Sequence, residues 1–302
     1  MDLHLFGSTT AVGYAFLNLA VSSGVFDAVI PYSRRQSLGS THATLVDLNG
    51  PDSFLPSGAL GTHSVLVSFA PIWLLSSFLE RISLSHPHWF YGFRGVVACS
   101  SSSAITKRFA SNRFDRDLVA RLLVAEDQLL DTCRRLSISC IILRPTVIYG
   151  KVGPYGDQNL SLLLRQMRRL PFFPLPAETG MRQPIHATQL ASVALHLVQQ
   201  LTDDGWEHFL PDRLAVGGDT TLTYAQMLRD LQKVHAPGDP VLRCRFLSIP
   251  NRLFFLLSAP LFLRSPKAFE AVLRMGVDLS GFTPAHQLLG SEPQPFPVLP
   301  LA

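Results

Sequence analysis

The chain has 302 residues, a mass of 33.3 kDa and a formal net charge of +4, a length that fits one large domain or two modest ones. Hydrophobic residues make up 47% of it and charged residues only 16%. With a mean hydropathy of +0.23, this composition excludes an intrinsically disordered protein. Of the 26 basic residues, 22 are arginines scattered without a basic stripe, so we predict no nucleic-acid partner.

Signals for export and for membrane spanning are weak. Residues 1–16 contain no basic region and no small-residue cleavage site, so we expect no secretory signal. The most apolar run, residues 253–263, lies between Arg252 and Arg264 and contains Pro260. It is shorter than the ~20 residues that a spanning helix needs. We expect it either to form a buried helix pair or to lie on a membrane surface.

The four cysteines show no CxxC pair and no metal-like spacing to histidine. Cys99 and Cys140 lie inside apolar runs, where a free cysteine behaves as a small hydrophobe. We therefore predict a reduced, cytoplasmic compartment and no metal site.

Short apolar runs alternate with helical patterns through the first half of the chain, which is typical of parallel βαβ units. The runs are almost continuously apolar, so the strands are expected to be buried on both faces of a sheet. The first helix is expected to extend from Ala11 to Ser23, with Gly24 as its left-handed C-cap. The predicted strands cover residues 2–6, 28–32, 43–46, 64–69, 95–99 and 138–143.

The clearest helical pattern covers residues 115–136, where Leu118, Leu122 and Leu129 follow the 3.6-residue period. Acidic residues open this segment and arginines close it, as the helix dipole favours. We therefore predict a long helix between the last two strands.

The order of elements changes after Gly150. A helix is expected to end at Arg169, another to cover about 188–201, and a strand to lie at 215–216. A capping box at residues 223–226 opens one more helix, and the proline-rich tail shows no clear periodicity.

Together these patterns predict an α/β fold: a Rossmann-like, doubly wound parallel sheet with a smaller C-terminal α/β substrate lobe. We expect the sheet domain over residues 1–170 and the lobe over residues 171–302, partly interleaved with the first.

A glycine-bearing turn joins the first predicted strand to the first helix. Gly7 and Gly13 enclose Ser-Thr-Thr-Ala-Val. Glycine suits a backbone that turns with positive φ or approaches a ligand closely. A helix N-terminus attracts a pyrophosphate through its unpaired amides and its dipole. The turn therefore predicts a nucleotide site.

These residues are similar to the fingerprint of the extended short-chain dehydrogenase/reductase superfamily, in particular its NAD-dependent epimerase/dehydratase family. The fingerprint is GxxGxxG; Gly7 and Gly13 fit it, whereas Thr10 replaces the middle glycine. The resemblance covers nearly the whole chain, and further matches occur in the family's order. They are Ser33-Arg34-Arg35, Asp47-Leu48, Ser68-Phe69-Ala70-Pro71, the serines at 100–103, Leu143-Arg144-Pro145, Tyr149-Gly150, Arg182 through His186, and Leu289-Gly290 with Pro293.

The resemblance implies a nicotinamide cofactor. NAD-using relatives place a carboxylate at the end of the second strand, whereas an arginine suits the 2′-phosphate of NADP. This chain has Arg34 and Arg35 there and no acid, so we predict NADP in preference to NAD. Asp47 resembles the residue that contacts the adenine, and Ala70 one beside the nicotinamide ribose. The implied cofactor-binding residues are Gly7, Thr9, Thr10, Ala11, Val12, Gly13, Ser33, Arg34, Arg35, Asp47, Leu48, Ala70 and Pro71.

The family's proton-transfer pair, Tyr-x-x-x-Lys on the helix after the fifth strand, is missing. None of the six tyrosines is followed four residues later by a lysine. Aligning the helix on Ala125 and Glu126, which resemble a family segment, places Leu118 and Leu122 where that pair would be. Catalysis would therefore need other groups. The candidates are Ser101, Ser102 and Lys107.

The resemblance also suggests roles around the reacting centre. Ser101 or Ser102 would hydrogen-bond the reacting oxygen, and Lys107 would act as acid or base or bind a substrate phosphate. Tyr149 is a reserve proton donor or a pocket residue. The implied substrate-binding residues are Tyr149, Arg182 and His186. Arginines that could contact a diphosphate are Arg144, Arg168, Arg169 and Arg182.

Two functions follow from this sequence. The first is an NAD(P)-binding, epimerase/dehydratase-like oxidoreductase that acts on a nucleotide-sugar or a similar small carbonyl or alcohol substrate. The second is a catalytically degenerate NADP-binding sensor or assembly protein. Either one is compatible with peripheral membrane contact through residues 246–263 and with a homodimer.

Overall fold

The computed structural model describes residues 1–34, 43–50, 54, 63–110, 112–202 and 211–299. Within them the main layer is a sheet of eight strands in the order β16-β13-β6-β5-β4-β1-β2-β3, all paired in parallel. The part β3-β2-β1-β4-β5-β6 has the Rossmann order. The strands are β1 (Asp2–Phe6), β2 (Ala28–Ser33), β3 (Thr44–Leu45), β4 (Ser64–Ser68), β5 (Phe93–Cys99), β6 (Ser139–Pro145), β13 (Arg213–Gly217) and β16 (Thr283–Pro284).

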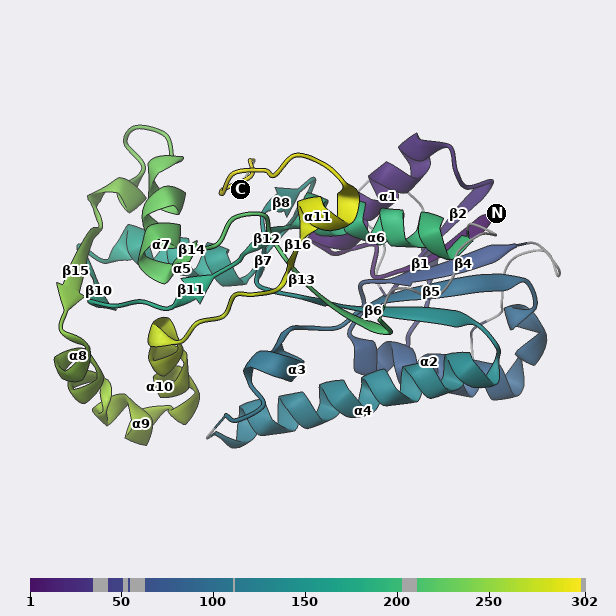
Figure 1. Ribbon diagram of the computed structural model, residues 1–302, viewed down its shortest axis with the longest axis horizontal. Coiled ribbons are helices and arrows are strands. Elements are labelled where there is room, and N and C mark those ends of the chain that lie inside the picture. Colours follow the sequence, from purple (N-terminus) through teal and green to yellow (C-terminus); the bar gives the residue numbers. More distant parts are fainter. Residues whose placement is uncertain (35–42, 51–53, 55–62, 111, 203–210, 300–302) are drawn as a thin grey trace.

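Helices cover both faces of this sheet (Figure 1). One face carries α1 (Ala11–Ser23), α6 (Ala187–Thr202) and α11 (Ala285–Leu289), and the other carries α2 (Ile72–Ser85) and α4 (Arg113–Arg135). The central strand β4 is buried along its whole length, because apolar side chains of both layers pack on it. The predicted doubly wound parallel sheet is confirmed.

The best-predicted unit is the first strand, turn and helix. β1 has the predicted bounds, α1 covers residues 11–23 as predicted, and Gly24 closes the helix with φ of 65°. α4 begins at Arg113, two residues before the prediction, because Asn112 accepts a hydrogen bond from the Asp115 amide at 2.9 Å and caps the helix. Such side-chain caps satisfy otherwise unpaired first-turn amides.

A second lobe lies beyond the carboxyl edge of the sheet (Figure 1). It contains α5 (Asn159–Arg169), α7 (Tyr224–Lys233) and two small strand pairs around a separate core. The capping-box prediction holds in part, since the Thr223 hydroxyl accepts from the Gln226 amide at 3.1 Å, while the Gln226 side chain bonds Asp230 instead. The pairs are β10 (Phe172–Pro176) with β15 (Arg245–Ile249), and β11 (Met181–Arg182) with β14 (Leu222–Thr223).

The two lobes are interleaved in sequence. α5 precedes residue 171 yet packs in the core of the second lobe, whereas β13, β16 and α6 return to the sheet. Short elements connect the lobes and fill the remaining turns. They are β7 (Ile148–Tyr149), β8 (Lys151–Val152), β9 (Tyr155–Gly156), β12 (Ile185–His186), α3 (Ser103–Thr106), and the 3-10 turns η2 (Pro87–Phe90) and η3 (Pro240–Arg243).

The tail that lacked periodicity folds into three short helices and a turn: α8 (Asn251–Ser258), α9 (Pro260–Arg264), α10 (Pro266–Leu273) and η4 (Arg274–Gly276). Prolines open α9 and α10, where a missing amide costs nothing. The expected buried helix pair over residues 253–263 is wrong, because α8 buries only Phe254 and its leucines are exposed. No described helix is long and apolar enough to cross a membrane.

Candidate functional site

A pocket of about 260 Å³ lies at the carboxyl ends of β1, β2 and β4. Ligands of open parallel sheets bind at this edge. Most of the residues predicted to bind a cofactor meet here, while Arg35 lies outside the described residues. The predicted residues that line the pocket are Gly7, Thr9, Thr10, Ser33, Arg34, Asp47, Leu48, Ala70 and Pro71.

Both fingerprint glycines are required by close backbone contacts. Gly7 has φ of 77°, and a Cβ there would lie 2.6 Å from the Ala70 amide nitrogen. A Cβ on Gly13 would lie 2.1 Å from the Gly7 carbonyl oxygen. Neither neighbour is a flexible side chain, so larger residues would displace the turn. The glycines thus let β1, the turn and the start of α1 pack tightly around the pocket.

Thr10 explains the departure from the family fingerprint. Its φ is −108°, a conformation that needs no glycine. Its hydroxyl donates to the Gly7 carbonyl and accepts from the Gly13 amide, both at 3.0 Å. Thr10 therefore caps α1 and holds the turn, and Ala11, Val12 and Gly13 form the first helical turn behind it.

The end of β2 supplies the polar rim of the pocket. Ser33 lies 3.3 Å from Thr9, hydroxyl oxygen to hydroxyl oxygen, and the exposed Arg34 lines the pocket. Asp47 accepts from the backbone and side-chain amides of Asn49 at 3.0 and 3.3 Å, which fixes the turn after β3.

A larger cavity of about 490 Å³ lies at the carboxyl ends of β5 and β6, between the sheet and the second lobe. Its lining contains three cationic side chains and, among the described residues, no carboxylate. The cations come from three segments of the chain, and the serine run at 100–103 also lines the cavity. The cations are Lys107, Arg182 and Arg274.

The candidate serines differ in their bonding. Ser100 donates to the buried Glu126 carboxylate at 2.5 Å. Ser101 accepts from the Ser103 amide at 3.1 Å, which leaves its own O–H to donate. Among the described residues, no hydrogen bond engages the hydroxyl of Ser102, which lines the cavity. Ser101 and Ser102 thus line the cavity with hydroxyls that can donate to a ligand, and Ser103 lines it as well.

Lys107 is held by a buried carboxylate. Its ammonium lies 2.7 Å from Asp115, whose other oxygen accepts from Arg274 at 2.5 Å and from Asn112 at 2.7 Å. Burial alone would raise the pKa of the Asp115 carboxyl, but the hydrogen bonds from Lys107, Arg274 and Asn112 hold that pKa well below its usual value. One carboxylate on α4 therefore fixes two cations of the cavity, and Arg274 belongs to the second lobe.

Arg182 carries a buried charge without a carboxylate partner among the described residues. Its guanidinium donates to the carbonyls of Met181 and Val277 at 2.7 Å and of Arg274 at 2.5 Å, and it lies 5.2 Å from the ring centre of Tyr224. Burial lowers the pKa of Arg182. A cation paired only with carbonyls and a ring favours an anionic ligand beside it.

Tyr149 and His186 lie behind the cavity rather than in its lining. Both are buried, with ring centres 5.1 Å apart. The Tyr149 hydroxyl accepts from the Val298 amide at 2.8 Å, and burial raises its pKa to about 12. The His186 ring packs against Gly150, where a Cβ would lie 2.1 Å from Nε2. These residues support the cavity wall.

The two leucines aligned with the family's tyrosine and lysine also have apolar surroundings in the structure. Leu122 is fully buried in the core between α4 and the sheet, and Leu118 packs against the same core. Neither residue lines the cavity. The two leucines therefore cannot transfer a proton in this structure.

The other proposed diphosphate arginines are engaged elsewhere or exposed. Arg144 pairs with the buried Glu126, and Arg168 binds both oxygens of Asp239 at 3.1 and 3.0 Å. Arg169 is exposed at the end of α5 and does not line the cavity. Of the four arginines, only Arg182 lines the cavity.

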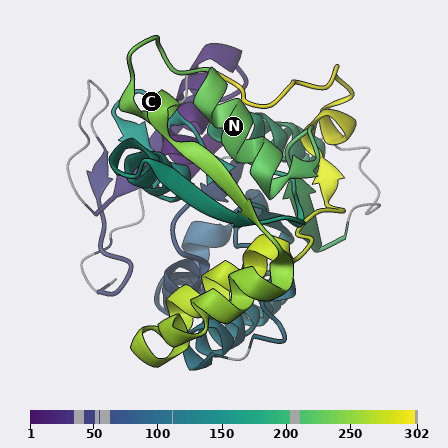
Figure 2. The ribbon, with the colours of Figure 1, turned by 90° about the vertical axis from the view of Figure 1, so that its left-hand side faces the viewer.

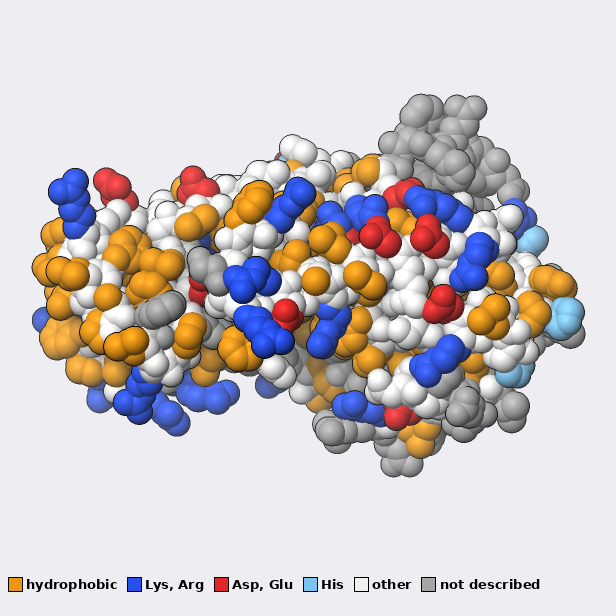
Figure 3. Space-filling model, turned by 90° about the horizontal axis from the view of Figure 1, so that it is seen from below, with side chains coloured by type: hydrophobic (Ala, Val, Ile, Leu, Met, Phe, Trp, Pro, Cys, Tyr) orange, Lys and Arg blue, Asp and Glu red, His pale blue; other side chains and the backbone are white. Residues whose placement is uncertain are grey.

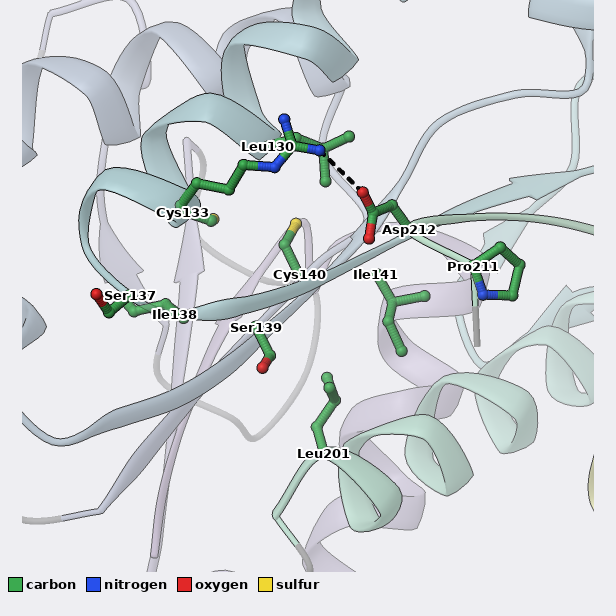
Figure 4. Close-up of a pocket in the computed structure, with 11 residues that line it drawn as sticks. Leu130, Cys133, Ser137, Ile138, Ser139, Cys140, Ile141, Leu201, Pro211 and Asp212 are labelled. Carbon is green, nitrogen blue, oxygen red and sulfur yellow. Dashed lines mark hydrogen bonds and ion pairs between the residues drawn. The ribbon is translucent and has the colours of Figure 1, made fainter. Parts of the chain in front are cut away.

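A third hollow, of about 450 Å³, lies at the opposite edge of the sheet (Figure 4). It is bordered by Cys133 on α4 and Cys140 on β6. It is also bordered by an ion pair between Arg134 and Asp212, whose charged atoms lie 3.0 Å apart. Hydrogen bonding to Cys133 and burial raise the pKa of the Cys140 thiol. This edge holds the amino ends of the strands, away from the ligand-binding edge of such sheets, so we place the site in the other two pockets.

Together, the described elements form a Rossmann-type fold with a second lobe over the carboxyl edge of its sheet. Sequence reasoning missed Arg274, Thr146 and Gln183, which also line the cavity. Arg274 lies 159 residues from Asp115 in sequence and carries no motif. Gln183 stands inside the family-like segment from 182 to 186, which was the one available signal.

Solved structures share this architecture. MoeE5 in complex with UDP-glucose and NAD matches with a TM-score of 0.59 at 16% identity, over 98% of this chain and 94% of that one. UDP-glucuronic acid 4-epimerase from Bacillus cereus in complex with NAD matches with 0.60 at 12%, over 97% and 94%. RMD from Pseudomonas aeruginosa complexed with NADPH matches with 0.57 at 12%, over 97% and 94%.

At these identities the likeness shows the fold, and it confirms the predicted Rossmann-like architecture. No family model matches the chain, and no curated protein matches its sequence.

Proposed function

We propose that this chain is an NADP-dependent oxidoreductase of the extended short-chain dehydrogenase/reductase kind, acting on a nucleotide-sugar or a similar phosphorylated carbonyl or alcohol. The observation that carries the proposal is the 490 Å³ cavity, which is lined by three cations and by no described carboxylate. A diphosphate brings the complementary charge. The structural neighbour MoeE5 was solved with UDP-glucose, which supports the same substrate class.

The nucleotide pocket fits a dinucleotide. Gly7 and Gly13 leave backbone where a Cβ would intrude, and the first turn of α1 offers unpaired amides to a pyrophosphate. Arg34 on the rim suits a 2′-phosphate. The described end of β2 contains no carboxylate that could bind a ribose 2′-hydroxyl instead. When bound, the cofactor supplies hydride transfer, and the chain supplies position and charge.

In the cavity, the hydroxyls of Ser101 and Ser102 donate to the reacting oxygen of the substrate. Lys107 already directs one N–H to Asp115, and its remaining N–H groups contact a phosphate oxygen. Arg182 and Arg274 hold the same anionic group from the second lobe. The lobe thus orients the substrate against the carboxyl edge of the sheet, where the nicotinamide would lie.

A second candidate is an NADP-binding sensor that does not turn over a substrate. The observation that favours it is the burial of Leu122 in the apolar core, at the position aligned with the family's lysine. A leucine there has no group that could transfer a proton. This candidate keeps the nucleotide pocket and assigns the cavity to an effector.

One experiment separates the two candidates. Purified protein is titrated with NADPH by fluorescence and then screened with nucleotide-sugars for cofactor oxidation, reduction or epimerisation. Turnover of at least one compound supports the oxidoreductase, and NADPH binding without turnover across the panel supports the sensor. Absence of NADPH binding contradicts both.

A double substitution tests the proposed role of the two serine hydroxyls. We expect the double substitution Ser101→Ala and Ser102→Ala to lower turnover about a hundredfold while the Kd for NADPH stays unchanged. Ser22→Ala, at an exposed position on α1, is the matched control. Full turnover by the double variant would remove both hydroxyls from the reaction.

A further inference from the structure

The helices α8 and α9 expose an unusual number of leucines. Leu253, Leu256, Leu257 and Leu263, here called the leucine edge, have 47%, 70%, 64% and 88% of their surface exposed. Figure 3 shows hydrophobic side chains gathered at the left-hand end of the molecule, the end that holds α8 and α9 in Figure 1. A large contiguous patch of exposed apolar side chains is typical of a surface that binds a protein partner or a membrane.

The leucine edge belongs to a protruding part of the second lobe. α8 packs against β10 and α10 on its inner side, where Phe254 is the buried anchor. The view in Figure 2 faces this end of the lobe, with α8 to α10 at the front. The leucines are exposed at this end of the lobe, while Phe254 of the same helix is buried, so they are open to insertion into a soft layer.

Positively charged residues flank these leucines in the sequence, and the carboxylate of Glu178 lies 3.4 Å from the Asn251 side chain at the start of α8. From Arg243 to Phe269 the sequence contains no aspartate or glutamate, although it contains four arginines and a lysine. The arginines are exposed, and none of them takes part in an ion pair between described residues. They are Arg243, Arg245, Arg252 and Arg264. Unpaired arginines next to exposed leucines match the headgroups and the acyl boundary of an anionic bilayer.

We propose that the chain binds peripherally to the surface of an anionic lipid bilayer through the leucine edge. The leucines of α8 and α9 enter the interface between headgroups and acyl chains, and Arg252 and Arg264, which flank them, contact lipid phosphates. Because α10 also lines the cavity through Ala271, binding in this way brings the cavity close to the membrane. The proposal is independent of the reaction performed in the cavity.

The test is flotation of the purified chain with two kinds of vesicle. One contains phosphatidylcholine alone, and the other contains in addition roughly 30 mol% phosphatidylglycerol, which makes its surface moderately anionic. We expect at least fivefold more protein to float with the anionic vesicles. Most of this gain should be lost in 0.5 M salt, because the Debye length there is only roughly 3–5 Å and the attraction between arginines and lipid phosphates is screened. Equal flotation with both compositions, or none, overturns the proposal.

One pair of variants tests the leucines. Leu256→Ser with Leu257→Ser should abolish flotation, because two of the inserted side chains are lost. Leu84→Ser, which removes a 73% exposed leucine from α2, should leave flotation unchanged. Equal loss in both variants contradicts the assignment.

A second pair tests the arginines. Arg252→Gln with Arg264→Gln should lower flotation about tenfold, because both phosphate contacts beside the leucine edge are lost. Arg165→Gln with Arg229→Gln, at exposed positions of α5 and α7, removes the same charge elsewhere and should leave flotation unchanged. If both double variants lose flotation to the same extent, net charge rather than this surface drives binding.

Folding and self-association are read in the same samples. Circular dichroism and NADPH binding show whether a variant is folded, and if the leucine variant is unfolded, the arginine variants and the lipid and salt dependence of the native chain decide. Light scattering reports the oligomeric state. A native dimer that the leucine substitutions convert to a monomer, without flotation of the native chain, would make this surface a contact between two copies and overturn the proposal.

Discussion

The nucleotide pocket and the larger cavity lie at the same edge of the sheet, but the first depends on close backbone contacts and the second on charged side chains. The pocket depends on backbone approach at Gly7 and Gly13, whose neighbours lie within 2.6 Å of a virtual Cβ. The cavity depends on charge, with Lys107 and Arg274 fixed by one carboxylate, Asp115. The steric requirement at the pocket comes from backbone atoms of Gly7 and Ala70, whereas the cavity is held by charged side chains from distant segments. The two regions should therefore fail in different ways.

The largest effect is expected at the pocket. Gly13→Val places side-chain atoms against the Gly7 carbonyl, 2.1 Å from the Cβ position, and should weaken NADPH binding more than a hundredfold, measured by fluorescence titration. This loss should not depend on salt. Gly50→Ala is the control, because nothing lies within 4 Å of its Cβ position. Native-like affinity in the valine variant would show that the pocket is not the nucleotide site.

The next effect is expected at the carboxylate of the cavity. Asp115→Asn leaves Lys107 and Arg274 without their buried partner and should lower the free energy of unfolding by about 3 kcal/mol at neutral pH, measured by urea denaturation. Asp117→Asn on the same helix is the control. Its carboxylate is 62% exposed beside Arg113, so the loss there should stay below about 0.5 kcal/mol.

The same carboxylate gives a pH dependence. Since the folded pKa of Asp115 lies below its unfolded value, its stabilisation is fully present above the unfolded pKa of about 4 and is lost as the pH falls below that value toward the folded pKa. The substitution Asp115→Asn should flatten this part of the pH–stability profile, measured by urea denaturation at each pH. An unchanged acid limb would contradict the ion-pair account.

A smaller effect should separate the two regions by function. Lys107→Gln removes a cation from the cavity wall and should raise KM for a phosphorylated substrate roughly tenfold, with NADPH affinity unchanged. Lys233→Gln, an exposed lysine paired with Asp230, is the control. Should the substitution lower kcat with KM unchanged, Lys107 acts on the reacting atoms instead.

The smallest effect concerns cofactor choice. Arg34 is exposed, so solvent and salt screen its contact, and Arg34→Ser should weaken NADPH binding only about fivefold while NADH affinity stays the same. The comparison is made by fluorescence at low and moderate salt. Equal loss for both cofactors would contradict a contact with the 2′-phosphate.

The sequence predicted the sheet well because its strands are apolar on both faces and its turns are local. The bounds of β1 and α1 follow from a strand, a glycine turn and a capping residue within 24 positions. The substitution of Thr10 for glycine became clear only from its φ and its two hydrogen bonds. The strand, turn and helix were thus predicted from the sequence, whereas the role of Thr10 was not.

The cavity was less accessible to sequence reasoning. Lys107 was proposed from its place after the serines, but its partner Asp115 and the shared Arg274 meet through an ion pair between η4 and α4. Tyr149 and His186 match family positions and yet are buried. The Tyr149 hydroxyl accepts from the Val298 amide of the tail, and the His186 ring lies beside Thr188 and Gly150. Such features require the tertiary structure.

Asp115 also joins the two lobes, since α4 packs on the sheet and Arg274 belongs to the second lobe. A ligand anion that draws Arg274 toward itself competes with this carboxylate and weakens the tie. If an anion in the cavity weakens this ion pair by some factor, then by thermodynamic reciprocity the intact ion pair weakens anion binding by the same factor. Binding of an anion and the contact between α4 and the second lobe would then be coupled through Asp115.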